Sequence, residues 1–276
     1  MTDTNIVRNP GLVVLDGEGA VREGGWSLWR ARGKTFLVEW AEADQGAQAL
    51  VREFDDETII VFPRSGGDIV SQGKTHQVPP RAVAVVPTGA FTLAMPAGSV
   101  AILLSPLRAA KVATMNDADY GEGDEGIRPV GPATPRADDG GLQIIEVDRI
   151  VPPADKPRLK MVRSATMSIN WIEYQGVRDR SKLSPHAHED FEQGSLAIAG
   201  RFLHHLRVPW GPDANAWRDD EHLEAPARSL CVIPPRMIHT TEGLGEGEHI
   251  LIDIFAPARE DFIAKGWMAN SRAYRN

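Results

Sequence analysis

The chain has a single cysteine, no surplus of positive charge and no long apolar run, and each shortage excludes a class of protein. Cys231 alone cannot form an internal disulfide, which is typical of a reducing compartment. No apolar stretch reaches the ~20 residues that cross a bilayer, and the N-terminal residues lack the apolar core of a secretion signal. The net charge of −8 argues against a nucleic-acid surface or a polybasic membrane patch. We therefore expect a cytoplasmic protein that binds neither nucleic acid nor membrane.

Glycine and proline are instead plentiful, with 26 and 20 residues in a chain of 276, and they separate short runs of strand-forming residues. Turns at intervals of about eight to twelve residues are typical of an all-β sandwich or barrel. Between residues 116 and 141 the chain is rich in Gly, Pro and Asp, which predicts a linker or mobile loop. We predict an N-terminal β domain over 1–110, a linker over 111–142 and a C-terminal β domain over 143–276 with a short C-terminal helix.

The segment Ser184–Gly200 contains two histidines, His186 and His188, which are two residues apart. Side chains at that spacing share one face of a strand, so two inward imidazoles would make half of a metal site. His239, which follows a double-proline turn, offers a third imidazole. The alternative interpretation is two surface histidines in a loop and one core histidine. Three histidines in this arrangement favour a site for a divalent transition metal, and Fe, Ni, Mn, Cu and Zn all suit it.

An internal repeat relates the two halves of the chain. Three positions recur at a constant offset of 147 residues: Arg81, Pro87 and Thr92 correspond to Arg228, Pro234 and His239. The similar strand content on either side indicates a duplicated fold. Seven of the eight histidines follow residue 180, and Thr92 stands where the second half has His239. The metal site is therefore predicted in the second half alone.

These segments resemble the cupin superfamily, and the repeat makes the chain similar to a bicupin. The first cupin motif is matched by His186, His188, Gln193 and Gly200, and the second by Pro234 and His239, with Arg236 in place of a glycine. The resemblance implies two double-stranded β-helix barrels of the jelly-roll type, with a metal bound in the second by His186, His188, Gln193 and His239. Glu192 is the alternative to Gln193, and since neighbours in a strand point to opposite faces, at most one of them can reach the metal. The motif's spacing of six residues before its glycine, here Gly200, favours Gln193.

The resemblance also implies a function. A metal-dependent enzyme acting on a small organic acid or carbonyl compound is expected, with a dioxygenase as the first reaction class. An isomerase or lyase of a sugar acid is the alternative enzyme, and a bicupin that binds a small ligand without catalysis is the alternative outside catalysis. Three neutral imidazoles and a neutral amide would leave the charge of the metal uncompensated, so we predict an anionic substrate. A homodimer is expected, and the loop Pro209–Trp217 could serve as a lid or a dimer contact.

Three residues are candidates for catalytic roles beside the metal: Tyr174, Arg201 and His205. Tyr174 could act as an acid or base, or it could be a core or rim aromatic. Arg201 could clamp a carboxylate, which guanidinium geometry suits, or end a strand in solvent. His204 and His205 are neighbours in a strand, where one would be buried and the other exposed. The functional alternative places one of them in the barrel mouth as a proton donor.

Overall fold

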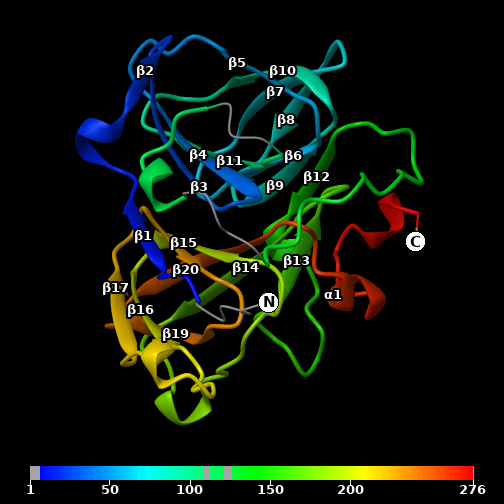
Figure 1. Ribbon diagram of the computed structural model, residues 1–276. Helices are drawn as coiled ribbons and strands as arrows, with labels where there is room; N and C mark the ends of the chain where they lie inside the picture. Colours follow the sequence, from blue (N-terminus) through cyan, green and yellow to red (C-terminus); the bar gives the residue numbers. More distant parts are fainter. Residues whose placement is uncertain (1–6, 109–111, 121–125, 276) are drawn as a thin grey trace.

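A computed structural model describes residues 7–108, 112–120 and 126–275, which form two β-barrels that lie one above the other in Figure 1. Each barrel consists of a large and a small sheet. The large sheet of the first barrel contains, in spatial order, β12 (Gln143–Glu146), β9 (Ala82–Val86), β6 (Thr58–Phe62), β11 (Val100–Pro106), β4 (Phe36–Ala43), β3 (Trp26–Arg32) and β2 (Val21–Glu23). Its small sheet contains β5 (Leu50–Phe54), β10 (Gly89–Ala94), β7 (Gly67–Ser71) and β8 (Lys74–Val78). This architecture confirms the predicted all-β, double-barrel fold.

The second barrel repeats the arrangement with fewer strands. Its large sheet contains β1 (Gly11–Val14), β18 (Ser229–Ile233), β15 (Gln193–Ala199), β20 (Glu248–Phe255), β14 (Ser168–Gln175) and β13 (Lys160–Arg163). Its small sheet contains β17 (Glu221–Ala225), β16 (Arg201–Arg207) and β19 (Ile238–Leu244). The α-helix α1 spans Glu260–Ala264, and short 3-10 turns span Gly17–Gly19, Asp117–Asp119, Val147–Arg149, Arg180–Lys182, Ala214–Ala216 and Ser271–Ala273. Within the described residues, no helix is long and apolar enough to cross a membrane.

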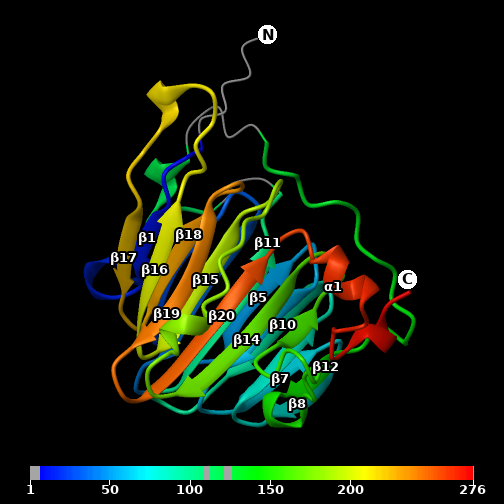
Figure 2. The same cartoon turned by 90° about the horizontal axis from the view of Figure 1, so that it is seen from below.

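The two large sheets pack against each other (Figure 2), and buried side chains from both form one apolar core. Side chains alternate between the faces of a strand, so Ile59 and Val61 of β6 join this shared core, whereas Ile60 and Phe62 pack inside the first barrel. In β20, Ile252 and Ile254 join the shared core in the same way. The large sheets are therefore apolar on their shared face, and each barrel has a separate interior.

The interiors of the two barrels differ. Aromatic and aliphatic side chains fill the first, including Trp26, Leu28, Phe91 and Leu93, all of which are buried. In the second barrel the apolar clusters are small, and buried polar groups such as Ser195 and Asp253 lie on the inward positions. Among the described residues, the interior of the second barrel is thus the more polar of the two.

Each barrel receives its edge strand from the other half of the chain. The strand β1 pairs with β18, and β12 pairs with β9. The backbone N–H of Leu15 donates to the carbonyl of Arg228 at 2.6 Å, and that of Val147 donates to the carbonyl of Arg81 at 2.9 Å. Arg81 and Arg228, which the repeat aligns, both have left-handed backbones, with φ of 55° and 63°. Both halves thus exchange an edge strand at the aligned arginine. As a result, β1 of the predicted domain 1–110 belongs to the second barrel, and β12 of the predicted domain 143–276 belongs to the first.

Replacing Leu15 by alanine is expected to lower the free energy of unfolding by about 2–5 kcal/mol. Leu15 is fully buried in the shared core, so truncation leaves a cavity where the exchanged strand meets the second barrel. Leu12, which lies in β1 just before Leu15, is 36% exposed, and Leu12→Ala is the matched control, with an expected change of at most about 0.5 kcal/mol. Equilibrium denaturation in urea measures both changes, and equal effects of the two substitutions would contradict the exchanged-strand packing.

The part of the predicted linker that the structure describes packs on both barrels, and the N–H of Thr134 donates to the carbonyl of Ala165 in the second half at 2.9 Å. The Asn116 amide donates to the carbonyl of Arg32 at 2.9 Å and accepts from the Arg32 N–H at 3.0 Å, and Asn116 is buried. Val130 is buried in the shared core. Side-chain bonding to the barrel backbone thus gives this polar segment an ordered place despite its composition.

Candidate metal centre

Three histidines meet inside the second barrel. One ring nitrogen from each of His186, His188 and His239 lies within 4.8 Å of the others, and no other group of three or more His, Cys, Asp or Glu does so among residues 7–108, 112–120 and 126–275. His188 and His239 are buried, whereas His186 is exposed. The residues that the sequence predicts as the imidazole ligands are therefore brought together in space.

The local structure around the His186–His188 pair differs from the predicted strand. Residues 183–192 are not in a named strand, and only His186 forms a β-bridge, with His239. The His186 N–H donates to the carbonyl of His239 at 3.0 Å, and the reverse bond measures 2.8 Å. The prediction that both histidines lie in one strand is wrong, because this segment pairs with β19 at a single position. The bridge, rather than strand alternation, orients His186 beside His239.

Backbone carbonyls select the ring nitrogens that face the centre. The Nδ1 atom of His186 lies 2.9 Å from the carbonyl of Ser184, and Nδ1 of His239 lies 2.9 Å from that of Met237. A carbonyl only accepts, so each Nδ1 carries the proton and each Nε2 keeps its lone pair. Metal-binding histidines are commonly held through this second nitrogen. The two rings are therefore prepared to ligate through Nε2, and the donor set fits a divalent transition metal.

The amide of Gln193 joins this group. Its Oε1 lies 3.0 Å from Nε2 of His188 and 3.3 Å from Nε2 of His239. Its Nε2 donates to Oγ of Ser195 at 3.0 Å and to Oδ1 of Asp253 at 3.2 Å, which aims the oxygen at the histidines. The ligation of a metal by these four side chains stays a prediction, and the geometry suits it.

Glu192 points the other way. Its carboxylate is fully buried, forms an ion pair with Arg8 and accepts from the backbone N–H of Lys34 at 2.5 Å. Both partners belong to the N-terminal half of the chain. Gln193 is the first residue of β15, and its neighbour faces the opposite side, as alternation requires. Glu192 therefore joins the two halves, and Gln193 is the residue that reaches the histidines.

Burial keeps two of the imidazoles neutral. Desolvation lowers the pKa of His188 to about 4, and desolvation together with the nearby His186 lowers the pKa of His239 to about 3. Burial raises the pKa of Asp253 to about 6, against the opposing effect of its hydrogen bonds from Ser195 and Asn170. Near neutral pH the histidine lone pairs are thus available without loss of a proton.

A cavity of about 640 Å³ opens from this group toward solvent, and His186, Gln193, His239 and Asp253 line it. Arg158 and Arg178 also line it, and both guanidinium groups lie near the ring of Tyr174, at 6.0 and 5.8 Å. Within the part of the chain that the structure describes, neither has an ion-pair partner. Burial and the positive charge of Arg178 lower the pKa of Arg158. The sequence reasoning missed this arginine pair, because both lie in loops whose approach to the barrel no local pattern reveals.

Tyr174 lies on the wall of the cavity, and its role there as an acid or base stays a prediction. Its hydroxyl oxygen accepts from the N–H of Gly243 at 2.7 Å, and its ring stacks on His249 at 5.1 Å. Burial raises the pKa of this hydroxyl above its ordinary value of 10. The phenol therefore stays protonated at neutral pH, with its O–H free to donate toward a bound molecule.

Arg201 and His205 lie outside the cavity. In β16, Phe202, His204 and Leu206 are buried toward the barrel interior, so alternation turns Arg201 and His205 to the outer face. The catalytic roles predicted for these two residues do not fit this placement. His204 is the inward neighbour, and its Nδ1 lies 2.8 Å from Oγ1 of Thr241. The sequence does not reveal which residues of β16 face the barrel interior, because either of the two adjacent histidines could point inward.

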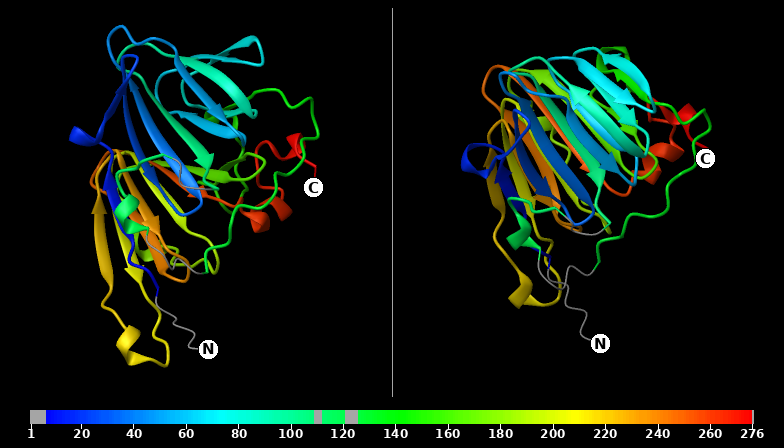
Figure 3. Two further views of the ribbon diagram at one scale, coloured as in Figure 1. Left: turned by 45° about the horizontal axis from the view of Figure 1, so that its top comes forward. Right: turned by 90° about the horizontal axis from the view of Figure 1, so that it is seen from above.

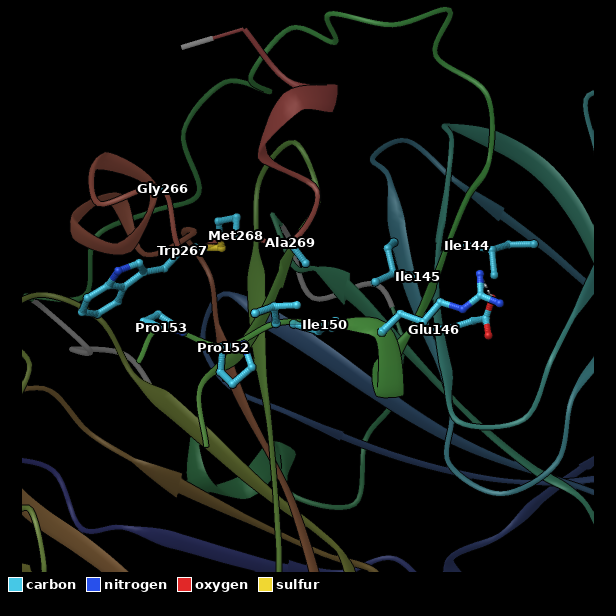
Figure 4. A pocket seen from close by; sticks show the side chains of 12 residues that line it. Ile144, Ile145, Glu146, Ile150, Pro152, Pro153, Gly266, Trp267, Met268 and Ala269 are labelled. Carbon is cyan, nitrogen blue, oxygen red and sulfur yellow. Dashed lines mark ion pairs between the residues drawn. The ribbon is translucent and has the colours of Figure 1, made fainter. Parts of the chain in front are cut away.

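The loop that was predicted as a lid or dimer contact also lies away from the cavity. The loop between β16 and β17 extends away from the barrel (Figure 3), and its Trp210 and Trp217 stack at 4.6 Å on each other, not on the cavity wall. A groove of about 710 Å³ between residues 144–153 and 266–269 is lined mainly by isoleucine, proline and tryptophan (Figure 4). The charged residues of its lining, Glu146 and Arg149, form an ion pair with each other.

No protein-family model matches the sequence, and no curated protein is significantly similar to it. Solved structures do match the fold. A variant of oxalate decarboxylase from Bacillus subtilis has a TM-score of 0.60 and 12% sequence identity, covering 92% of this chain and 79% of that chain. AerE from Microcystis aeruginosa has a TM-score of 0.56 at 10% identity, with 91% and 98% covered. Protein Ylba from E. coli has a TM-score of 0.54 at 13% identity, with 91% and 94% covered. The protein therefore has a bicupin fold, with a candidate metal centre in the second barrel.

Proposed function

We propose that the second barrel is the active site of a metal-dependent enzyme that acts on a small organic acid. One observation supports this best: three of the four prospective ligands, His186, Gln193 and His239, line one cavity together with two arginines that have no ion-pair partner among the described residues. A divalent metal held by three imidazoles and an amide would supply a Lewis acid with an uncompensated charge. Arg158 and Arg178 would bind the carboxylate of the substrate, because guanidinium groups pair with carboxylates through two parallel hydrogen bonds.

The chain's own groups supply the remaining parts. The Tyr174 hydroxyl would donate a hydrogen bond to a substrate oxygen, since its own oxygen already accepts from Gly243. Leu251, Phe255 and Ile172 form the apolar part of the wall and would exclude water from the reacting region. Dioxygen-dependent cleavage is the reaction class that we propose first, as expected of bicupins with an open histidine site.

A metal-dependent lyase or isomerase is the second candidate, and two observations favour it. The carboxyl group of Asp253 lines the cavity and could hold a proton that the reaction moves. The structural neighbours include oxalate decarboxylase, for which Mn(II) centres are described in the Bacillus subtilis protein. A fold likeness at this level of identity shows no activity, so the two reaction classes are separated by experiment.

The test uses the purified chain, stripped of metal and reloaded with Mn(II), Fe(II), Ni(II), Cu(II) or Zn(II). Small mono- and dicarboxylic acids, 2-oxo acids and sugar acids are screened with and without oxygen. Turnover with stoichiometric oxygen uptake supports the dioxygenase, whereas turnover without oxygen supports the lyase or isomerase. A protein that binds acids tightly but turns none over with any metal would be a binding protein, and His186→Ala must abolish any activity assigned to the centre.

Arg178→Ala is expected to raise KM for the acid about 10- to 100-fold with a smaller effect on kcat, because a charged hydrogen bond contributes about 1.5–3 kcal/mol. Arg201→Ala is the matched control, because it also replaces one arginine by alanine. It should leave KM unchanged, since Arg201 lies on the outer face of β16. Steady-state kinetics of the two variants measure the difference. Equal KM values for wild type and Arg178→Ala would remove Arg178 from substrate binding.

A further inference from the structure

A second pair of histidines lies on the outer face of the small sheet, away from the cavity. His205 of β16 and His222 of β17 occupy directly opposed positions on neighbouring antiparallel strands. Their Nδ1 atoms are 2.8 Å apart, and the rings meet edge to face with centroids 4.9 Å apart. The side chain of His205 is partly exposed, and His222 is exposed. The two nitrogens are therefore fixed close together and open to solvent.

Glu242 holds the first of these rings. Its Oε1 lies 2.9 Å from Nε2 of His205, and its Oε2 lies 3.2 Å from Nε of Arg180. The paired, buried carboxylate accepts from His205, so Nε2 carries the proton and Nδ1 presents a lone pair toward His222. A carboxylate behind the distal nitrogen of a ligating histidine is the usual outer partner of metal sites, where it fixes the ring and raises its basicity.

We propose that His205 and His222 bind one divalent transition-metal ion through their Nδ1 atoms, independently of the centre in the barrel. Metal–nitrogen bonds of about 2.0 Å place neighbouring ligands about 2.8 Å apart at right angles and about 3.3 Å apart in a tetrahedron. The distance between the two nitrogens matches right-angled positions. The site therefore suits Cu(II) or Ni(II) in tetragonal coordination, with water in the remaining positions. Without metal, the Nδ1–H of His222 donates to the lone pair of His205. When the ion binds, that hydrogen moves through solvent to Nε2 of His222, and the exposed His222 ring turns so that both Nδ1 lone pairs meet at the ion, while Glu242 keeps the His205 ring in place.

The sheet positions both ligands on rigid elements. His205 is on the central strand of the three, and Glu242 is on β19, the strand on its other side. His222 is on the edge strand β17. Arg180 comes from the short turn before the His186–His188 segment, so Glu242 and Arg180 are positioning residues that act through His205. An ion at this site would link two strands and leave the cavity unblocked.

The experiment titrates Cu(II) and Ni(II) into metal-free His186→Ala protein, which lacks a ligand of the barrel centre. One equivalent of either ion is expected to bind, and the Cu(II) spectrum by electron paramagnetic resonance should show coupling to two nitrogens. Adding His222→Ala should weaken binding at least tenfold and reduce the coupling to one nitrogen. Glu242→Gln should weaken it about 10- to 100-fold, as expected of an outer partner.

His76→Ala in the same background is the matched control, because His76 is a single histidine on β8 of the first barrel, and it should change nothing. The proposal is overturned if His222→Ala leaves the affinity within twofold, or if the His186→Ala protein binds neither ion. Failure of the barrel centre would appear differently, since wild-type protein would then bind one ion and lose it on His222→Ala alone.

Discussion

Gln193→Ala is expected to lower metal affinity about 100-fold or more, because it removes a prospective direct ligand. Substituting a residue that only hydrogen-bonds to a ligand already lowers metal affinity about 10- to 100-fold. Glu192→Ala, one residue away, should leave metal affinity nearly unchanged and destabilise the protein by about 3–5 kcal/mol, as when one partner of a buried ion pair is removed. The reason is the opposite orientation of the two side chains, toward the histidines and toward Arg8.

Calorimetric metal titration and denaturation in urea measure the two effects on the same pair of variants. Because the residues are adjacent, a general disturbance of β15 would alter both quantities in both variants. The assignment is wrong if Glu192→Ala loses metal affinity while Gln193→Ala retains it. Glu192→Gln serves as a milder variant if the alanine substitution prevents folding, since it keeps the shape and removes the charge that faces Arg8.

The metal-free protein is expected to lose stability steeply as the pH falls from about 6 to about 4. Burial lowers the pKa of His188, His204 and His239 to about 4, 3 and 3, against an ordinary value of 6.5. In this range the unfolded chain therefore binds three protons that the folded chain does not. Asp253 acts oppositely, because its pKa of about 6 lets the folded chain bind one proton that the unfolded chain does not.

The net difference of two protons predicts that the free energy of unfolding decreases by about 2.7 kcal/mol per pH unit on acidification. The sign follows because the unfolded state binds more protons, so stability rises with pH. His204→Gln should reduce the slope to about 1.4 kcal/mol per unit, since His204 is fully buried and lies outside the predicted ligand set. Urea denaturation at intervals of pH measures the slope, and a flat profile would contradict the buried, neutral state of these histidines.

The local pattern of the chain was sufficient for the fold class, the duplication and the predicted ligands. Runs of strand formers between turns depend on neighbouring residues alone, and the offset of 147 between Arg81 and Arg228 needs no coordinates. The motif spacing back from Gly200 selected Gln193, and the structure shows a reason for the glycine. Its φ is 85°, and a Cβ there would meet the carbonyl oxygen of Glu248 at 2.7 Å.

Other features were decided by tertiary structure. Which barrel β1 and β12 complete depends on contacts between residues far apart in the chain, and no local period carries that information. The inward or outward direction of a strand residue changes with a shift of one position, so Arg201 and His205 were placed in the cavity although they lie outside it. Arg158 and Arg178 come from loops, which have no period at all. Composition and spacing thus predicted the fold and the three histidines that meet, whereas long-range packing decided which side chains share a cavity.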